Sequence, residues 1–354
     1  MTHAIVPPYL LARIASVQEP AMAKAALAAR ATLAAPGPHR DAPRTRVRLS
    51  IEEPGTLVVE SAPAPERTVF DAENGEELPG TKVRGEDDGP TGDEAVDEAF
   101  DGLGKTFDFY WAAYERNGID GSGAALLATV HYGSDYDNAF WNGEQMVFGD
   151  GDGEVFTGFT NSLTVIAHEL THGVTENEGG LEYQGQSGAL NESLSDVFGV
   201  LVEQYALSQT ADEASWLIGE GIFTDAVQGD ALRSLKAPGT AYDDDVLGKD
   251  PQPAHMDDYV QTTDDNGGVH INSGIPNHAF YLAATTLGGN AWERAGLVWY
   301  RTLTGDLSPT ADFDAFAAAT VAAATEEYGE SSEVVDAIRA GWVGVGVMED
   351  DTSA

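Results

Sequence analysis

The pattern of apolar and polar positions changes near residue 160, and this change predicts two lobes. Ahead of it, short apolar runs alternate with glycine-rich turns, as is typical of strands, and a longer stretch at 91–116 indicates a helix. The predicted strands are 125–132, 139–141 and 145–148. Beyond it, apolar residues recur at helical spacing, and the predicted helices are 161–178, 189–207, 273–287, 291–303, 310–328 and 332–343. We therefore expect an α+β fold with a β-rich N-terminal lobe and a mainly helical C-terminal lobe.

The first 60 residues form a separate predicted unit. An alanine-rich pattern from Ala21 to Leu33 predicts a helix, which Pro36 and Pro38 end. Short β-like runs follow at 47–51 and 56–59, ahead of further prolines at 63 and 65. The predicted parts are an arm and linker at 1–60 with a boundary between 50 and 68, a β-rich lobe at 61–160, a helical lobe at 161–346 and an acidic tail at 347–354.

The charge of the chain excludes one class of partner. The net charge is −41, from 59 acidic and 18 basic side chains, of which five are lysine. Nucleic acid is a poor partner, because phosphate binding needs a basic surface. An acidic, lysine-poor surface repels itself in dilute buffer and is stabilised when salt screens it. We expect adaptation to a salty medium or cytoplasm, with ordinary acidic solubility as the alternative.

The charge is unevenly distributed along the chain. Residues 1–50 carry seven bases and two acids, a charge of +5, so the rest of the chain carries −46. A basic arm ahead of an acidic body can dock on that body electrostatically, and a disordered basic tail is the alternative.

The sequence shows neither a membrane span nor a conventional export signal. No apolar run approaches the roughly 18 residues of a spanning helix, so a membrane is not an expected partner. The first residues lack the charged start and apolar core of a secretory signal. The chain has no cysteine, which leaves the compartment open.

The segment from His168 to His172 has the H-E-x-x-H pattern of zinc hydrolases. On a helix, the two imidazoles lie four positions apart on one face and can reach one zinc ion. Glu169 lies beside them, placed to take a proton from a metal-bound water. The pattern is short, so coincidence is the alternative for these five residues alone.

A catalytic zinc takes three protein ligands, so a third must come from elsewhere. The class with H-E-x-x-H-x-x-G-x-x-H is excluded, because positions 175 and 178 are Thr and Glu. The next predicted helix supplies Glu192, with Asp196 four positions later on the same face. Asp196 can accept the free ring N–H of a zinc-bound histidine. Alone, Glu192 would be read as a solvated helix residue.

Together these segments resemble the thermolysin family of neutral metallopeptidases. The similarity rests on 168–175 and 191–196, and further matching motifs occur in family order at 138–141, 180–184, 229–234 and 265–274. They cover most of the chain, from about residue 66 to 346. The resemblance implies a two-lobe architecture with the zinc helix at the cleft, and a neutral metalloendopeptidase acting as a monomer on peptides or proteins.

The resemblance also implies a role for residues beyond the zinc ligands His168, His172 and Glu192. Glu169 would be the general base, and His270 and Tyr183 would donate hydrogen bonds to the oxyanion. The other roles are support of the ligands by Asn191, orientation of His270 by Asp265, binding of a substrate carbonyl by Arg233, pairing with the substrate backbone by Asn138 and Ala139, and an apolar pocket lined by Val165 and Leu232. Cleavage before Leu, Phe or similar residues is expected.

The N-terminal arm, with Pro7-Pro8-Tyr9, resembles the short propeptide of the protealysin-like branch of this family. The arm is therefore expected to cover the cleft as an intramolecular inhibitor until it is cut between about 50 and 68. The family is mostly extracellular, which implies secretion, and an intracellular role competes because no conventional export signal is visible.

Calcium is doubtful. Long-chain members of the family bind paired calcium ions near the zinc helices, and Glu203 and Glu220 match two of those ligand positions. Other acidic positions are replaced by Thr164, Ser215, Leu217 and Gly221. Two carboxylates rarely complete a shell of 6–8 oxygen atoms, so a double site is not expected.

Two other functions fit parts of the sequence. A zinc aminopeptidase also uses H-E-x-x-H with a downstream Glu, but the Gly-x-Met-Glu-Asn stretch typical of its substrate-amine pocket is not found. A binding or inhibitory protein with an inert zinc site is disfavoured, because base, ligands and oxyanion donors occur together.

Overall fold

The computed structural model describes residues 3–35 and 63–349. The β-like runs expected at 47–51 and 56–59, and most of the expected cleavage region, lie outside these residues. Within the described part of the chain, no helix combines the length and apolar character needed to cross a membrane.

A six-stranded sheet forms the first lobe, in the order β1-β5-β6-β4-β2-β3. The strands are β1 (His3–Ala4), β2 (Arg67–Asp71), β3 (Thr81–Gly85), β4 (Leu126–Val130), β5 (Ala139–Trp141) and β6 (Met146–Phe148). The β2–β4 and β4–β6 pairs are parallel, and the others are antiparallel. Helix α3 (Glu94–Tyr114) begins at an Asp93 cap and buries Phe100, Leu103 and Phe107 in the core.

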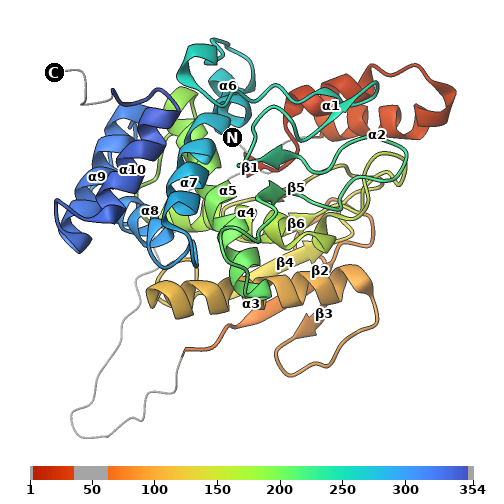
Figure 1. Ribbon diagram of the computed structural model, residues 1–354. Coiled ribbons are helices and arrows are strands. Elements are labelled where there is room, and N and C mark those ends of the chain that lie inside the picture. Colours follow the sequence, from red (N-terminus) through yellow and green to blue (C-terminus); the bar gives the residue numbers. More distant parts are fainter. Residues whose placement is uncertain (1–2, 36–62, 350–354) are drawn as a thin grey trace, which may run out of the picture.

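The second lobe is helical. It consists of α4 (Leu163–Asn177), α5 (Gly185–Leu207), α6 (Asp265–Asn272), α7 (Gly274–Leu287), α8 (Ala295–Leu303), α9 (Phe313–Tyr328) and α10 (Glu333–Gly344). Figure 1 shows α4 and α5 in the middle of the molecule, between the sheet and the C-terminal helices. Short strand pairs complete the lobe: β7 (Leu217–Ile218) with β8 (Arg233–Ser234), and β9 (Asp243–Asp244) with β10 (Gly248–Lys249).

Helices α4 and α5 are buried on nearly every side, and they pack closely. A Cβ added at Gly199 of α5 would lie 3.0 Å from the Thr164 carbonyl oxygen of α4, so this approach requires a residue without a side chain. Ser162 begins α4, but its hydroxyl contacts Thr164 Oγ1 instead of capping a backbone N–H. The close pairing of the two helices brings their polar side chains together inside the protein.

The N-terminal arm is ordered around two helices, α1 (Pro8–Ala15) and α2 (Ala23–Ala34), joined by the 3-10 turn Pro20–Met22. Ahead of α1, β1 pairs antiparallel with β5, with His3 opposite Trp141 and Ala4 opposite Phe140. The arm therefore adds a strand to the edge of the sheet (Figure 1).

Candidate active site

The facing sides of α4 and α5 bring three metal-binding side chains together. His168 Nε2 lies 3.1 Å from His172 Nε2 and 3.5 Å from Glu192 Oε2, and His172 Nε2 lies 3.4 Å from Glu192 Oε1. Ligand atoms around a tetrahedral zinc ion at about 2.0–2.1 Å are roughly 3.3 Å apart. All three residues are fully buried. The two imidazole nitrogens and the Glu192 carboxylate therefore already lie at the spacing that a zinc ion requires.

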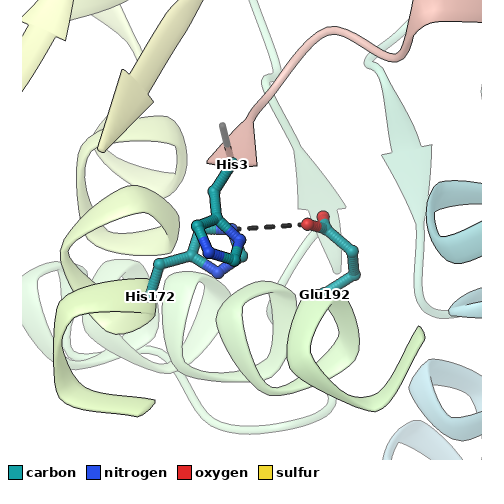
Figure 2. A group of neighbouring side chains, drawn as sticks. All are labelled: His3, His172 and Glu192. Atoms are coloured by element: carbon teal, nitrogen blue, oxygen red, sulfur yellow. Dashed lines mark ion pairs between the residues drawn. The ribbon is translucent and has the colours of Figure 1, made fainter. Parts of the chain in front are cut away.

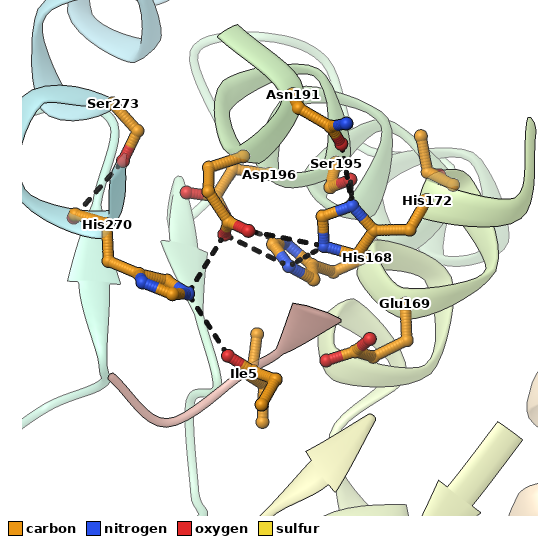
Figure 3. Close-up of polar contacts among 12 residues, drawn as sticks. Ile5, His168, Glu169, His172, Asn191, Ser195, Asp196, His270 and Ser273 are labelled. Atoms are coloured by element: carbon orange, nitrogen blue, oxygen red, sulfur yellow. Dashed lines mark hydrogen bonds and ion pairs between the residues drawn. The ribbon is translucent and has the colours of Figure 1, made fainter. Parts of the chain in front are cut away.

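The outer nitrogen of each histidine is held by α5. His168 Nδ1 lies 2.8 Å from Asp196 Oδ1, and His172 Nδ1 lies 2.8 Å from Asn191 Oδ1 and 3.1 Å from Ser195 Oγ (Figure 3). These contacts orient the inner nitrogens toward the metal position. Burial lowers the pKa of His172 well below its ordinary value, and the positive charges that His3 and His168 could carry lower it further. The ring is therefore neutral, as a metal ligand must be.

Asp196 is the centre of a buried polar network. Arg233 donates two hydrogen bonds of 2.8 Å to its carboxylate from Nε and Nη2, and Asn277 donates a third of 2.8 Å. Burial alone would raise the pKa of Asp196, but Arg233 and His168 hold it well below its ordinary value. Asp196 is thus ionised and fixes both a candidate ligand and a candidate substrate-binding side chain. Ser195 and Asn277 were not predicted from the sequence.

Glu169 lies on α4 beside the two histidines (Figure 3). Its Oε2 accepts a 2.9 Å hydrogen bond from the Trp141 backbone N–H, and burial next to Glu192 raises its pKa well above the ordinary value. Among the described residues, Glu169 Oε1 and Glu192 Oε2 are buried without a hydrogen-bond partner. Buried acceptors of this kind are costly unless a cation or a water satisfies them. The donor set therefore fits a zinc ion with a water beside Glu169.

His270 approaches from α6, after a run of left-handed backbone. Asn266, Gly267 and Gly268 have φ of 52°, 86° and 78°, and this run brings Asp265 back to His270. Asp265 Oδ1 lies 2.6 Å from His270 Nδ1, and its Oδ2 accepts the His270 backbone N–H at 3.0 Å. Burial lowers the pKa of His270, but Glu192 and Asp265 outweigh it and raise the pKa to about 9. His270 can therefore carry a proton on Nε2.

Tyr183 lies between the candidate ligands and His270. Its hydroxyl donates a hydrogen bond to Glu192 Oε1 and lies 3.2 Å from His270 Nε2. Its side chain thus faces the site, as the sequence predicted, but its proton is directed at Glu192.

The arm occupies the remaining space. Asn138 pairs with both backbone groups of Val6: its Oδ1 accepts the Val6 N–H at 2.9 Å and its Nδ2 donates to the Val6 carbonyl at 3.2 Å. Ile5 donates its N–H to the Ala139 carbonyl at 3.1 Å and accepts from Arg233 Nη1 at 3.1 Å. Val165, Leu232 and Ile5 are all buried in one hydrophobic core. Asn138, Ala139 and Arg233, which were predicted to hold a substrate, thus hold the arm.

Comparison with known proteins identifies the family. The model of the thermolysin metallopeptidase catalytic domain matches residues 50–176, and that of the thermolysin metallopeptidase alpha-helical domain matches residues 179–347. The chain belongs to the thermolysin family of metallopeptidases. It is a neutral metalloendopeptidase with the family's α+β fold, and both sequence predictions are confirmed.

Individual relatives in the thermolysin family agree with this assignment. An extracellular metalloprotease of Pectobacterium carotovorum is 57% identical over 282 residues, covering 79% of this chain and 81% of that protein. Protease PrtS of Photorhabdus is 52% identical and covers 80% of this chain and 78% of that protein. The structure of the precursor of protealysin, a metalloproteinase from Serratia proteamaculans, matches with a TM-score of 0.88 at 51% identity, over 98% of this chain and all of that chain.

Within the described part of the arm, apolar and backbone contacts outnumber ionic ones, and four of the seven basic residues lie outside the described residues. Of the arm's basic side chains in the described residues, Lys24 contacts an acid, Asp135, at 3.0 Å, and Arg13 donates to the Asp245 backbone carbonyl. By contrast, Ile5, Val6 and Leu10 are at most 1% exposed. In residues 3–35, backbone pairing and apolar burial therefore contribute most, because a desolvated apolar side chain stabilises docking more than a surface ion pair does. The contribution of the arm's total positive charge stays a prediction.

The two acidic residues at possible calcium positions, Glu203 and Glu220, lie close enough for the charge of Glu220 to act on Glu203. Burial, together with the charge of Glu220, raises the pKa of Glu203 to about 7. Among the described residues, the side chains that converge closely enough to hold a metal ion are His3, His172 and Glu192, with His168 beside them, and they include neither Glu203 nor Glu220. Thr164 instead accepts the Gly219 backbone N–H at 2.9 Å. Calcium binding here stays a prediction.

Proposed function

We propose that this metallopeptidase is a zinc endopeptidase in which His168, His172 and Glu192 bind the metal. The observation that carries this proposal is the 3.1–3.5 Å spacing of the two imidazole nitrogens and the Glu192 carboxylate oxygens, beside a buried Glu169 oxygen without a hydrogen-bond partner. When bound, zinc polarises the scissile carbonyl and lowers the pKa of a bound water toward about 7.

The surrounding side chains would carry the proton transfers and the developing charge. Glu169 accepts a proton from the attacking water and returns it to the leaving amine. His270, held by Asp265, donates from Nε2 to the carbonyl oxygen as that oxygen gains charge. Tyr183 joins it once its hydroxyl releases Glu192. Arg233, Asn138 and Ala139 hold the peptide backbone on either side of the bond.

The arm supports a specificity for bulky apolar residues just after the cut. The Ala4 carbonyl lies 3.1 Å from His270 Nε2, so the Ala4–Ile5 bond occupies the position of the bond to be cleaved. Ile5 is then the residue after the cut, and it is fully buried in the core that contains Val165 and Leu232. A branched apolar side chain in this position favours cleavage before Leu, Ile or Phe.

We further infer that the chain is made as a precursor and that residues 1–60 inhibit it until they are cut off between 50 and 68. Support comes from the backbone pairing of the arm within the cleft and from the precursor form of the protealysin neighbour. The names of the relatives support action outside the cell. The net charge of −41 supports adaptation to high salt and argues against binding to nucleic acid. We propose that the protein acts as a monomer that does not bind membranes.

A fluorogenic peptide blocked at both ends tests the endopeptidase proposal. The purified chain, after removal of the arm, should cut the peptide before an apolar residue, and a zinc chelator should abolish cleavage. Added zinc should restore it. Cleavage that proceeds in chelator contradicts the zinc proposal, and cleavage confined to peptides with a free amino terminus indicates an aminopeptidase instead.

A further inference from the structure

His3 of the arm lies inside the candidate metal site, although the sequence did not point to it. It is 2% exposed, and its ring lies against His172, with ring centres 4.2 Å apart and planes tilted by 30°. The His3 and Tyr183 rings meet edge to face, with their centres 4.2 Å apart. Figure 2 shows His3 reaching from β1 over His172, with Glu192 facing both from α5. An imidazole from outside the mature protein thus lies beside two candidate zinc ligands.

The spacing of these groups is near that of a coordination shell. His3, His172 and Glu192 each offer a ligand atom, and these atoms lie within 4.8 Å of one another. The edges of a tetrahedral zinc site are roughly 3.3 Å, so the His3 ligand atom must approach those of His172 and Glu192 by up to about 1.5 Å. A small change in the His3 side-chain torsions, within one rotamer, can supply such a shift without moving β1.

Glu176 can hold the His3 ring in place. Its Oε1 lies 3.5 Å from His3 Nε2, and its Oε2 accepts the Trp141 indole N–H at 3.2 Å. Histidines bound to zinc are commonly oriented by an outer carboxylate of this kind, as His168 is by Asp196. His3 therefore has both a metal position nearby and an orienting acid.

The direction of the arm creates a need for such a ligand. Ala4 and Ile5 present their carbonyls to His270 and Arg233 at 3.1 Å each, in the way a substrate is expected to bind. A peptide bound in this manner is exposed to attack unless the attacking water is displaced. An imidazole in the fourth position of the zinc ion displaces that water and leaves the bond intact.

We propose that His3 is a fourth zinc ligand in the precursor and locks the metal until the arm is removed. This inference rests on the proposed function, because it requires zinc on His168, His172 and Glu192. It adds a bond between the inhibitor and the metal to the backbone pairing already described. Departure of the arm then restores the open position and loosens the hold on zinc at the same time.

The test compares zinc-loaded full-length chains that carry Glu169→Gln, so that self-cleavage does not intervene. X-ray absorption counts the imidazoles bound to zinc, and competition with a chelator gives the rate of zinc release. His3→Phe and His3→Asn both remove the imidazole. The first replaces it with a large apolar ring and the second with a smaller polar side chain. His255→Phe removes a partly exposed histidine elsewhere and serves as the matched control.

The parent and the His255→Phe chain should show three imidazoles, and both His3 variants should show two. The His3 variants should also release zinc faster, by about tenfold or more. Two imidazoles in the parent, or unchanged release in both His3 variants, would overturn the proposal. Retained arm contacts are checked by protection of the arm from an added protease. A separate outcome concerns inhibition by the arm. If a chain with Glu169 intact is fully active before the arm is cut, the proposed inhibition is wrong, whether or not His3 binds zinc.

Discussion

His270 Nε2 lies 3.1 Å from the carbonyl oxygen of Ala4, a residue 266 positions earlier in the chain. This contact joins a group proposed to stabilise the oxyanion to a peptide bond of the protein's own arm. The arm therefore displays how a substrate would bind, and the predictions below use it as a guide.

Glu169→Gln removes the proposed base but keeps the size of the side chain and its hydrogen bond from Trp141. We expect the mature variant to fold and bind zinc but to lose about 10²–10⁴-fold or more in kcat. Casein cleavage and zinc content measured on one preparation check this. Near-normal cleavage by the variant would show that another group takes the proton.

His270→Ala removes the proposed oxyanion donor and leaves the three candidate zinc ligands in place. Loss of such a donor typically costs about 10²–10³-fold in kcat. Zinc content should stay unchanged, and KM should move less than kcat. Loss of metal from this variant would assign His270 to the zinc site instead.

Arg233→Lys tests the buried pair with Asp196, both fully buried. Lysine keeps the positive charge but cannot reproduce two parallel hydrogen bonds, and loss of a hydrogen bond to a charged group typically costs about 1.5–3 kcal/mol. Urea unfolding of the inactive full-length chain measures this. Arg294→Lys, which affects an exposed pair with Glu333, is the control and should change the free energy of unfolding by less than about 1 kcal/mol. Equal effects of the two substitutions would contradict the prediction.

The buried carboxyl group of Asp137 should make the stability of the folded chain depend on pH. Burial and the neighbouring Asp152 raise its pKa from an ordinary 3.8 to about 9. Between these values the folded chain holds a proton that the unfolded chain has released, so stability falls as pH rises through this window. Asp137→Asn removes the effect, and its gain in Tm over the parent should grow from pH 5 to pH 9. Asp257→Asn, at an exposed site, should run parallel to the parent. A constant difference for Asp137→Asn would refute the assignment.

Ile5→Asp tests how the arm is held. A charge in a fully buried apolar position carries a large desolvation cost, so the arm should leave the cleft. The full-length variant should cut a blocked peptide before its arm is removed. The control is Leu27→Asp, also on the arm but 66% exposed, which should stay inhibited. An inhibited Ile5→Asp chain would mean that other contacts suffice.

The sequence predicted the long helices and the short strands β4, β5 and β6, but it missed β1, β2 and β3. Helices α3, α5 and α9 were found within a few residues, because many turns of helical spacing support each one. Strands β2 and β3 were missed, since five residues with little burial contrast carry almost no pattern. Strand β1 has two residues and exists only because β5 pairs with it.

Some residues of the candidate site were predictable from local spacing, and others were not. The metal-binding residues and Asp196 were predicted, because helical spacing fixes which side chains share a face. His3 could not be predicted, because its position depends on the docking of a remote segment. Ser195 lies next to a predicted residue, and its spacing from Glu192 placed it near the same face. Asn277 carried no such signal.

Strand β5 has three residues, from Ala139 to Trp141, and the arm now pairs with its outer side. Once the arm departs, that side becomes an open sheet edge with unpaired backbone groups. Long open edges invite other chains to stack on them and seed aggregates. Three residues are too few for such growth, yet enough to seat a short extended peptide. Because this strand is short, its unpaired edge can bind a peptide without promoting aggregation.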